Sequence, residues 1–175
     1  CNGNAQTYRE VNLAASTLAN NLRQRGIKRG ERVAVLTALS AQLPQIIFGV
    51  MGARAQVTMM HSNFTDRELN PLFRISRPKA VLCEPKFAEA LLPLSNEIGF
   101  EIITISDQLW NYGSEGWNLD HLPNSEDDAV LLFTGGTTGV SKGVPHTHEQ
   151  IFAALIAIED RWPTVLEREI FLNVP

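Results

Sequence analysis

The chain has 175 residues, of which 44% are hydrophobic and 19% are charged. Such a composition is sufficient to build a hydrophobic core, and it excludes an intrinsically disordered protein. The formal net charge is −4, from 15 Lys and Arg against 19 Asp and Glu. No basic patch interleaved with aromatic residues is visible, so a nucleic-acid partner is disfavoured.

Two cysteines are too few for a disulfide framework, and Cys83 lies in the apolar segment AVLC, where a small buried residue is expected. We therefore predict a reducing, cytoplasmic location. No apolar run approaches the length of a transmembrane segment, and the N-terminus lacks the basic and apolar regions of a signal peptide. The chain does not begin with methionine, so we expect it to be a piece of a longer protein.

Helical and extended patterns alternate along the first 105 residues. We predict helices over residues 7–25, 40–50, 65–76 and 86–97, and strands over residues 32–38, 55–60, 80–83 and 100–105. Two capping boxes mark helix starts, Thr7 with Glu10 and Thr65 with Glu68, and Gly26 stands where a left-handed cap would end the first helix. This alternation predicts a doubly wound α/β fold with a largely parallel sheet and helices on both faces.

Turn-forming residues dominate residues 106–128, which are expected to be a linker or a surface excursion that includes the acidic run SEDD as a solvated loop. A buried strand over residues 129–134 and a helix over residues 149–162 follow. We therefore divide the chain into an α/β subdomain, residues 1–128, and a second part of the same domain, residues 129–175, that carries a strand, a loop and a helix.

Between that strand and that helix lies the segment TGGTTGVSKG, residues 134–143. Its glycines let the backbone turn tightly and bring N–H groups close to a bound anion, while hydroxyl groups and one lysine add further donors. The segment is therefore interpreted as a phosphate-binding loop. The lysine lies between Ser141 and Gly143, which excludes a Walker loop, and the spacing of a dinucleotide-binding motif is missing.

The segment TGGTTGVSKG closely resembles the signature loop of the adenylate-forming superfamily, which includes acyl-CoA synthetases, fatty acyl-AMP ligases, peptide synthetase adenylation domains and luciferases. Glycine at position 135 is more similar to the fatty acyl-CoA ligase branch. The resemblance covers nearly the whole chain, beginning with TYREVNLAASTLANNLRQRGIKRGERVAVL. Three features depart from the common pattern: the lack of proline after the second strand, Ser141 before the lysine, and Arg54 in place of a small residue.

The resemblance implies that the chain is part of a larger adenylate-forming N-terminal domain. The full protein would use ATP and Mg²⁺ to convert a carboxylic acid, such as a fatty acid, into an acyl-adenylate and pyrophosphate. The acyl group would then pass to coenzyme A or to the phosphopantetheine of a carrier protein. The resemblance assigns catalysis to Lys142 and phosphate binding to Thr134, Gly135, Gly136, Thr137, Thr138, Gly139, Ser141, Lys142 and Gly143.

Several alternatives remain open. The glycine segment could be a plain hairpin turn, or the protein could be a kinase with an unusual loop, or a non-catalytic nucleotide-binding or regulatory module of the same fold. His146 and His148 lack a third ligand, so no metal site is assigned to them, and Tyr8, Trp110 and Trp117 are expected to serve ordinary packing. The chain alone is expected to be inactive and to self-associate through an uncovered apolar face or a sheet edge.

Overall fold

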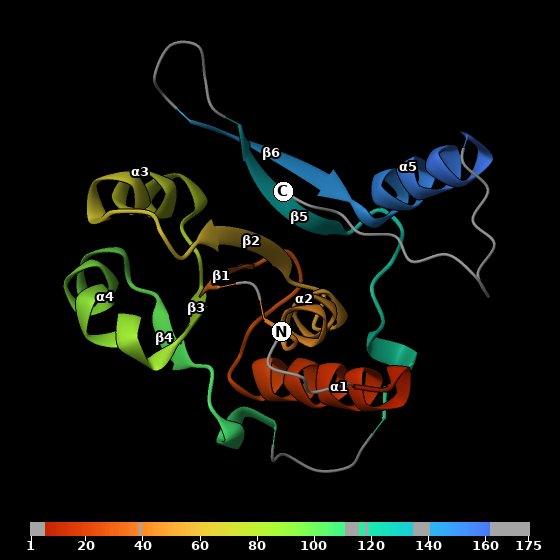
Figure 1. Ribbon diagram of the computed structural model, residues 1–175, viewed down its shortest axis with the longest axis horizontal. Helices are drawn as coiled ribbons and strands as arrows, with labels where there is room; N and C mark the ends of the chain where they lie inside the picture. The colour runs from red at the N-terminus through yellow and green to blue at the C-terminus, as the bar shows by residue number, and fades with distance from the viewer. Residues whose placement is uncertain (1–5, 39, 111–115, 118, 135–140, 162–175) are drawn as a thin grey trace.

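The structure is a computed structural model that describes residues 6–38, 40–110, 116–117, 119–134 and 141–161. Within these residues, six strands form one sheet in the order β4-β3-β1-β2-β5-β6 (Figure 1). The strands are β1 (Arg32–Thr37), β2 (Gln56–His61), β3 (Ala80–Cys83), β4 (Glu101–Thr104), β5 (Asp128–Thr134) and β6 (Lys142–Thr147). Neighbours from β4 to β5 are parallel and only β6 runs antiparallel, which confirms the largely parallel sheet.

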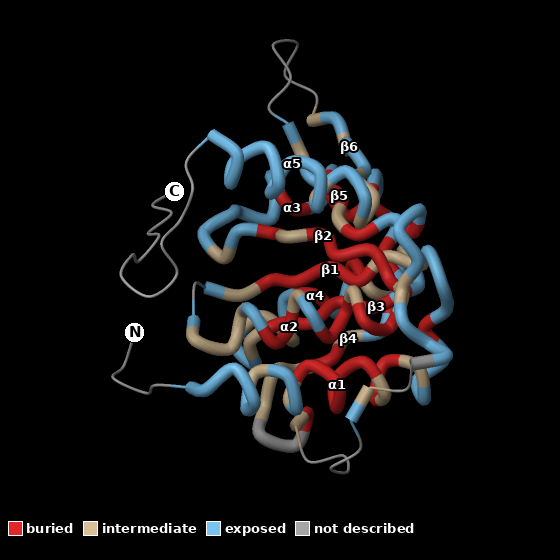
Figure 2. The backbone as a smooth tube through the Cα atoms, turned by 90° about the vertical axis from the view of Figure 1, so that its right-hand side faces the viewer, coloured by how far each residue is buried: buried red, intermediate tan, exposed pale blue. Residues whose placement is uncertain are grey.

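Helices cover both faces of this sheet, as the sequence predicts for a doubly wound fold (Figure 1). They are α1 (Tyr8–Gln24), α2 (Leu43–Gly52), α3 (Asp66–Ser76), α4 (Pro85–Ile98) and α5 (His148–Arg161), with short 3₁₀ segments η1 (Asp107–Trp110) and η2 (Leu119–His121). One core cluster joins α1 and α2 to the sheet, and the other joins α3 and α4 to the opposite face. The strands β1 and β3 lie between the two clusters and are almost wholly buried (Figure 2).

Both predicted capping boxes are present. The Thr7 backbone N–H donates to Glu10 Oε2 at 2.7 Å, and the Thr65 backbone N–H donates to Glu68 Oε2 at 2.8 Å. These backbone hydrogen bonds, followed by those from the threonine hydroxyls, lower the pKa of both glutamates. Gly26 has a φ of 82° directly after the C-cap of α1, a left-handed conformation that costs glycine little.

Helices α1 and α2 pack at very short range because α2 presents a glycine at the contact. A Cβ built on Gly49 would lie 2.8 Å from Leu18 Cβ, closer than real Cβ contacts. Any larger side chain would push the two helices apart.

The predicted start of α2 at Ser40 is wrong, since the helix begins at Leu43 after Gln42.

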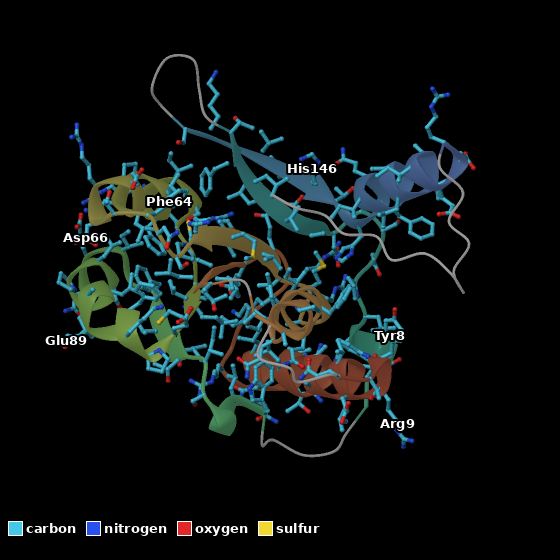
Figure 3. The ribbon with its side chains drawn as sticks, in the orientation of Figure 1. Tyr8, Arg9, Phe64, Asp66, Glu89 and His146 are labelled. Carbon is cyan, nitrogen blue, oxygen red and sulfur yellow. The ribbon has the colours of Figure 1, made fainter. Side chains whose placement is uncertain are left out.

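Cys83 is buried in β3, as expected, and burial together with the nearby charge of Glu84 raises the pKa of its thiol to about 11. Trp110 and Trp117 pack against the α1 and α2 core, and Trp117 Nε1 donates to Asn12 Oδ1 at 2.7 Å. The prediction that Tyr8 packs against the protein is wrong, because this side chain on α1 is 95% exposed (Figure 3). In the described part of the chain, no helix is long and apolar enough to cross a membrane.

Candidate functional site

The two ends of the glycine loop lie side by side at one edge of the sheet. Strand β5 ends at Thr134 and β6 begins at Lys142, and these two residues are paired in the antiparallel ladder. Thr134 Oγ1 donates to the Lys142 carbonyl at 3.4 Å. Among the predicted site residues, Thr134, Ser141, Lys142 and Gly143 are described, whereas Gly135, Gly136, Thr137, Thr138 and Gly139 lie outside the described residues.

A cavity of about 440 Å³ opens next to these loop ends. The carboxyl ends of β1, β2 and β5 contribute to it through Thr37, His61 and Thr134, and Ser141 adds the other end of the loop. Phe64, beside the start of α3 (Figure 3), also lines the cavity. Ligands of open α/β sheets usually bind outside the carboxyl ends of the strands, so the loop ends lie where a ligand site is expected.

The described groups at the loop ends suit an anion. Lys142 is exposed and, within the described residues, has no carboxylate partner. Thr134 and Ser141 add hydroxyl groups. Glu84 also lies at this edge, but its carboxylate accepts from the Ala38 backbone N–H at 2.7 Å and pairs with Lys86 at 2.9 Å. The hydrogen bond from Lys86, then that from Ala38, lowers the pKa of Glu84.

Gly143 has a packing reason to be glycine. A Cβ at this position would lie 3.2 Å from Leu131 Cδ1, tighter than most real contacts, so Leu131 would have to move. Since Leu131 belongs to β5, the first residues of β6 are held close to the strand that precedes the loop. A bulkier residue would alter the spacing of the two loop ends.

A metal site is not formed by the described residues, because no group of three or more His, Cys, Asp or Glu side chains among them could hold an ion. His146 lies on β6 (Figure 3), whereas His148 is the first residue of α5.

A buried carboxylate at the opposite end of β5 is a feature that the sequence reasoning missed. The side chain of Asp127 is 2% exposed, Arg29 Nε donates to Oδ1 at 2.7 Å, and Arg54 Nε donates to Oδ2 at 2.9 Å. Burial opposes the charge of Asp127, but hydrogen bonds from Arg54, the Asn124 backbone N–H and Arg29 outweigh it, so the pKa of Asp127 is lowered. The prediction of a solvated acidic loop is therefore wrong for Asp127.

This ion-pair cluster, defined as Asp127, Arg29 and Arg54, anchors the strand-loop-strand unit. The His148 backbone N–H donates to the Asp127 carbonyl at 3.1 Å, which ties the start of α5 to the residue before β5. The Gly30 backbone N–H donates to the Arg54 carbonyl at 2.9 Å, which joins the two arginine-bearing turns. Both strands that carry the loop are thus fixed at the end remote from it.

His148 lies between this ion-pair cluster and an apolar cavity bordered by α1, α2 and α5. Burial lowers the pKa of its imidazole, and the negative charge of Asp127 opposes that effect. Its Nε2 atom is buried without a hydrogen-bond partner among the described residues. A proton on this ring would be poorly solvated, so burial disfavours the protonated form of His148.

Comparison with known proteins identifies the family of this chain. The family model described as AMP-binding enzyme matches residues 1–174. Gramicidin S synthase 2 of Brevibacillus brevis is 29% identical over 87% of this chain and 3% of its own length. The 4-coumarate–CoA ligase-like 3 protein of Arabidopsis thaliana is 28% identical over 89% of this chain and 30% of its own length.

Solved structures agree with this family. ATP-bound MatB from Rhodopseudomonas palustris is 25% identical, with a TM-score of 0.82 over 91% of this chain and 33% of that one. The relatives compared are thus peptide synthetases and acyl-CoA ligases, and the chain spans less than a third of the length of the two sequences named above. The likeness to the superfamily is confirmed, and the likeness to one branch of it is not.

Proposed function

Because this chain belongs to the AMP-binding enzyme family, we propose that it is the N-terminal portion of an ATP-dependent ligase that converts a carboxylic acid into an acyl-adenylate. One observation carries the proposal. The segment TGGTTGVSKG, which resembles the signature loop of adenylate-forming enzymes, starts and ends at the carboxyl edge of the sheet beside a cavity. The ATP-bound form of MatB supports ATP as the nucleotide.

In the proposed first step, a carboxylate oxygen of the acid attacks the α-phosphorus of ATP. The bond between that phosphorus and the bridging oxygen to the β-phosphorus breaks, and pyrophosphate leaves with the electron pair. Hydroxyl groups of Thr134 and Ser141, with the ammonium group of Lys142, would hold the β- and γ-phosphates and offset the charge that grows on the leaving group. Magnesium, when bound, would share that charge.

In the proposed second step, the sulfur of a thiol attacks the acyl carbonyl carbon and its proton passes to solvent, the bond to the AMP oxygen breaks, and AMP leaves. The relatives suggest two acceptors, coenzyme A by likeness to the 4-coumarate–CoA ligase-like protein and the phosphopantetheine of a carrier protein by likeness to gramicidin S synthase 2. Glycine at position 135 favours a fatty acid as the substrate, because the loop there is more similar to fatty acyl-CoA ligases.

Residues 1–128 would then form the α/β subdomain of the ligase, and residues 129–175 would add the strand, the phosphate loop and the following helix of the same domain. We propose a cytoplasmic location on the basis of the low cysteine content and the buried Cys83. The groups that recognise adenine and the acyl chain are expected outside these 175 residues, so the chain alone should lack activity.

The test is acid-dependent exchange of radiolabelled pyrophosphate into ATP by the complete polypeptide, with a panel of fatty and aromatic carboxylic acids. Exchange with at least one acid, and none without acid, is the expected result. Adding coenzyme A or a phosphopantetheinylated carrier protein then identifies the acceptor. The same panel with hydroxylamine should yield no acyl-hydroxamate from the 175-residue chain.

Three outcomes would speak against the proposal. Nucleotide binding without exchange for any acid would favour the non-catalytic module of the same fold. Transfer of the γ-phosphate to a substrate would favour a kinase. Acid-dependent turnover by the 175-residue chain would refute the assignment of the remaining groups to other parts of the polypeptide.

A further inference from the structure

His61, the last residue of β2, lines the cavity at the loop ends and takes no part in the two proposed steps. Strands β2 and β5 run parallel and lie side by side (Figure 1). The last pair of their ladder is Thr58 with Leu131. His61 and Thr134 each end their strand three residues beyond that pair. The histidine and the start of the glycine loop therefore lie at the same level of the sheet edge, on neighbouring strands.

The turn that follows β2 fixes the orientation of the imidazole. The Phe64 backbone N–H donates to the His61 carbonyl at 3.0 Å, and the Asn63 backbone N–H donates to His61 Nδ1 at 3.1 Å. The ring centroids of His61 and Phe64 are 5.6 Å apart, and the two rings are inclined by 43°. The side chain of His61 is thus held by the turn and by a ring that lines the same cavity.

The contact at Nδ1 decides which ring nitrogen carries the proton. Because Nδ1 accepts a hydrogen bond, the proton of the neutral imidazole lies on Nε2. Among the described residues, Nε2 has no hydrogen-bond partner and no ion pair involves His61. A hydrogen-bond donor of fixed direction is therefore left for a ligand.

The surroundings of this donor favour an anion. The described side chains that line the cavity include no carboxylate, and apart from His61 the polar ones carry hydroxyl groups: Thr37, Ser62, Thr134 and Ser141. The rest of the wall is apolar and includes Met60, Phe64 and Phe133. Apolar walls lower the local dielectric constant, which strengthens a hydrogen bond to a charged group.

We infer that His61 is a further binding residue for the proposed reaction. Its Nε2–H group donates a hydrogen bond to an oxygen of the β- or γ-phosphate of ATP, and to the same oxygen once pyrophosphate has left. The inference rests on the proposed function, because it takes the loop ends as the phosphate site. Attacking and leaving oxygens lie roughly in line at the α-phosphorus, so a donor beside the loop contacts the pyrophosphate side and not the carboxylic acid.

Two substitutions separate this donor from the turn. His61→Asn has an oxygen close to the position of Nδ1, so it keeps an acceptor for the Asn63 N–H but has no donor at the position of Nε2. His61→Gln has its amide nitrogen close to the position of Nε2, so it keeps the donor. The complete polypeptide is titrated with inorganic pyrophosphate and Mg²⁺ in a calorimeter. Compared with wild type, the Kd should be about tenfold higher for His61→Asn and within about twofold for His61→Gln.

Two further measurements locate the effect. In the exchange reaction, the KM for pyrophosphate should increase in His61→Asn while the KM for the acid stays unchanged. The Tm of His61→Asn should equal that of wild type within about 1 °C, since the side chain is exposed and the acceptor of the turn is kept. The exposed His121 of η2, changed to asparagine, is the control and should leave the Kd for pyrophosphate unchanged.

A His61 that only stabilises the turn predicts a different result: both variants bind pyrophosphate like wild type, and His61→Gln has the lower Tm because it loses the acceptor at Nδ1. That result would overturn the inference. Equal weakening of both variants, a change in the KM for the acid alone, or no binding of pyrophosphate to the wild-type polypeptide would do so as well.

Failure of the ligase proposal is distinguishable from failure of this inference. Weaker pyrophosphate binding in His61→Asn but not in His61→Gln, in a polypeptide without exchange for any acid, would support the role of His61 and refute only the activity. Acid-dependent exchange that is the same in wild type and His61→Asn, with an unchanged KM for pyrophosphate, would refute only the role of His61.

Discussion

Arg54 Nε donates to Asp127 Oδ2 at 2.9 Å and so joins the turn between α2 and β2 to the residue that precedes β5, 73 positions further along the chain. Arg29 completes the ion-pair cluster from a third turn. The cluster lies at the end of β5 remote from the glycine loop, so it sets where the loop-bearing strands begin. The ion-pair cluster does not touch the loop, so any effect that it has on the position of the loop must pass through the backbone of β5.

Replacing Asp127 by asparagine should destabilise the fold by about 2–4 kcal/mol at neutral pH, because two arginines lose their partner. The folded pKa of Asp127 is lowered, so its contribution is present above the unfolded value of about 3.9 and is lost as the pH falls through the folded pKa. Urea unfolding should therefore separate the two proteins most at pH 7, and the separation should decrease as the pH is lowered from about 3.9 toward the folded pKa. The exposed neighbour Asp128, changed to asparagine, should behave like wild type at both pH values.

Arg54 combines its ion pair with a left-handed backbone, φ 62°. Arg54→Gly and Arg54→Ala both remove the ion pair, but only alanine keeps a Cβ in that conformation. Glycine should therefore be less destabilising than alanine by about 1 kcal/mol, as measured by chemical denaturation. Equal stability of the two variants would mean that the backbone relaxes out of the left-handed region without cost.

His148 predicts a second pH dependence of stability, which arises from burial of a basic group and not from ion pairing of an acidic one. Its folded pKa is lowered below 6.5, so the unfolded chain takes up a proton at a pH where the folded chain does not. Stability should thus be complete above about pH 6.5 and should decrease as the pH falls from there to the folded pKa. Thermal unfolding between pH 8 and pH 5 should show this slope in wild type and lose it in His148→Leu. The exposed His61, changed to glutamine, serves as the control and should retain it.

Lys142→Ala tests the loop in the complete polypeptide. Loss of one charge-assisted contact to phosphate costs about 1.5–3 kcal/mol, which corresponds to a decrease in kcat/KM of roughly 10- to 150-fold. The Tm should not change, because Lys142 is exposed. Pyrophosphate exchange kinetics would measure the decrease, with the exposed Lys28→Ala as the control. Unchanged exchange in Lys142→Ala would remove this lysine from the site.

Much of the fold follows from local sequence rules. The capping boxes at Thr7 and Thr65 place two helix starts, and AVLC is the strand β3 without a shift. These signals depend on residues at most a few positions apart. The start of α2 was harder to predict from the sequence. Ser40 is a good capping residue by type, but the helix begins three residues later, with Pro44 in its first turn.

The ion-pair cluster lay beyond such rules because its members are 73 and 98 residues apart in the sequence. The acidic run SEDD looked like a solvated loop, and Arg54 looked like an isolated departure from the family pattern. The pairing of β2 with β5 brings Arg54 next to Asp127, so the arginine explains the buried carboxylate and the carboxylate explains the arginine. A basic residue at an unusual position, together with a carboxylate just before a buried strand, was the available signal.

The order of the strands also bears on how the chain folds. Strands β1 to β4 pair with segments that lie nearer in the sequence, whereas β5 must return to pair with β2, where Val57 and Val130 are 73 positions apart. Closing that long loop costs entropy before the pairing compensates for it. We expect β1 to β4 to form the folding nucleus and β5, β6 and α5 to dock afterwards. Substitutions in the ion-pair cluster should then accelerate unfolding and leave the refolding rate nearly unchanged.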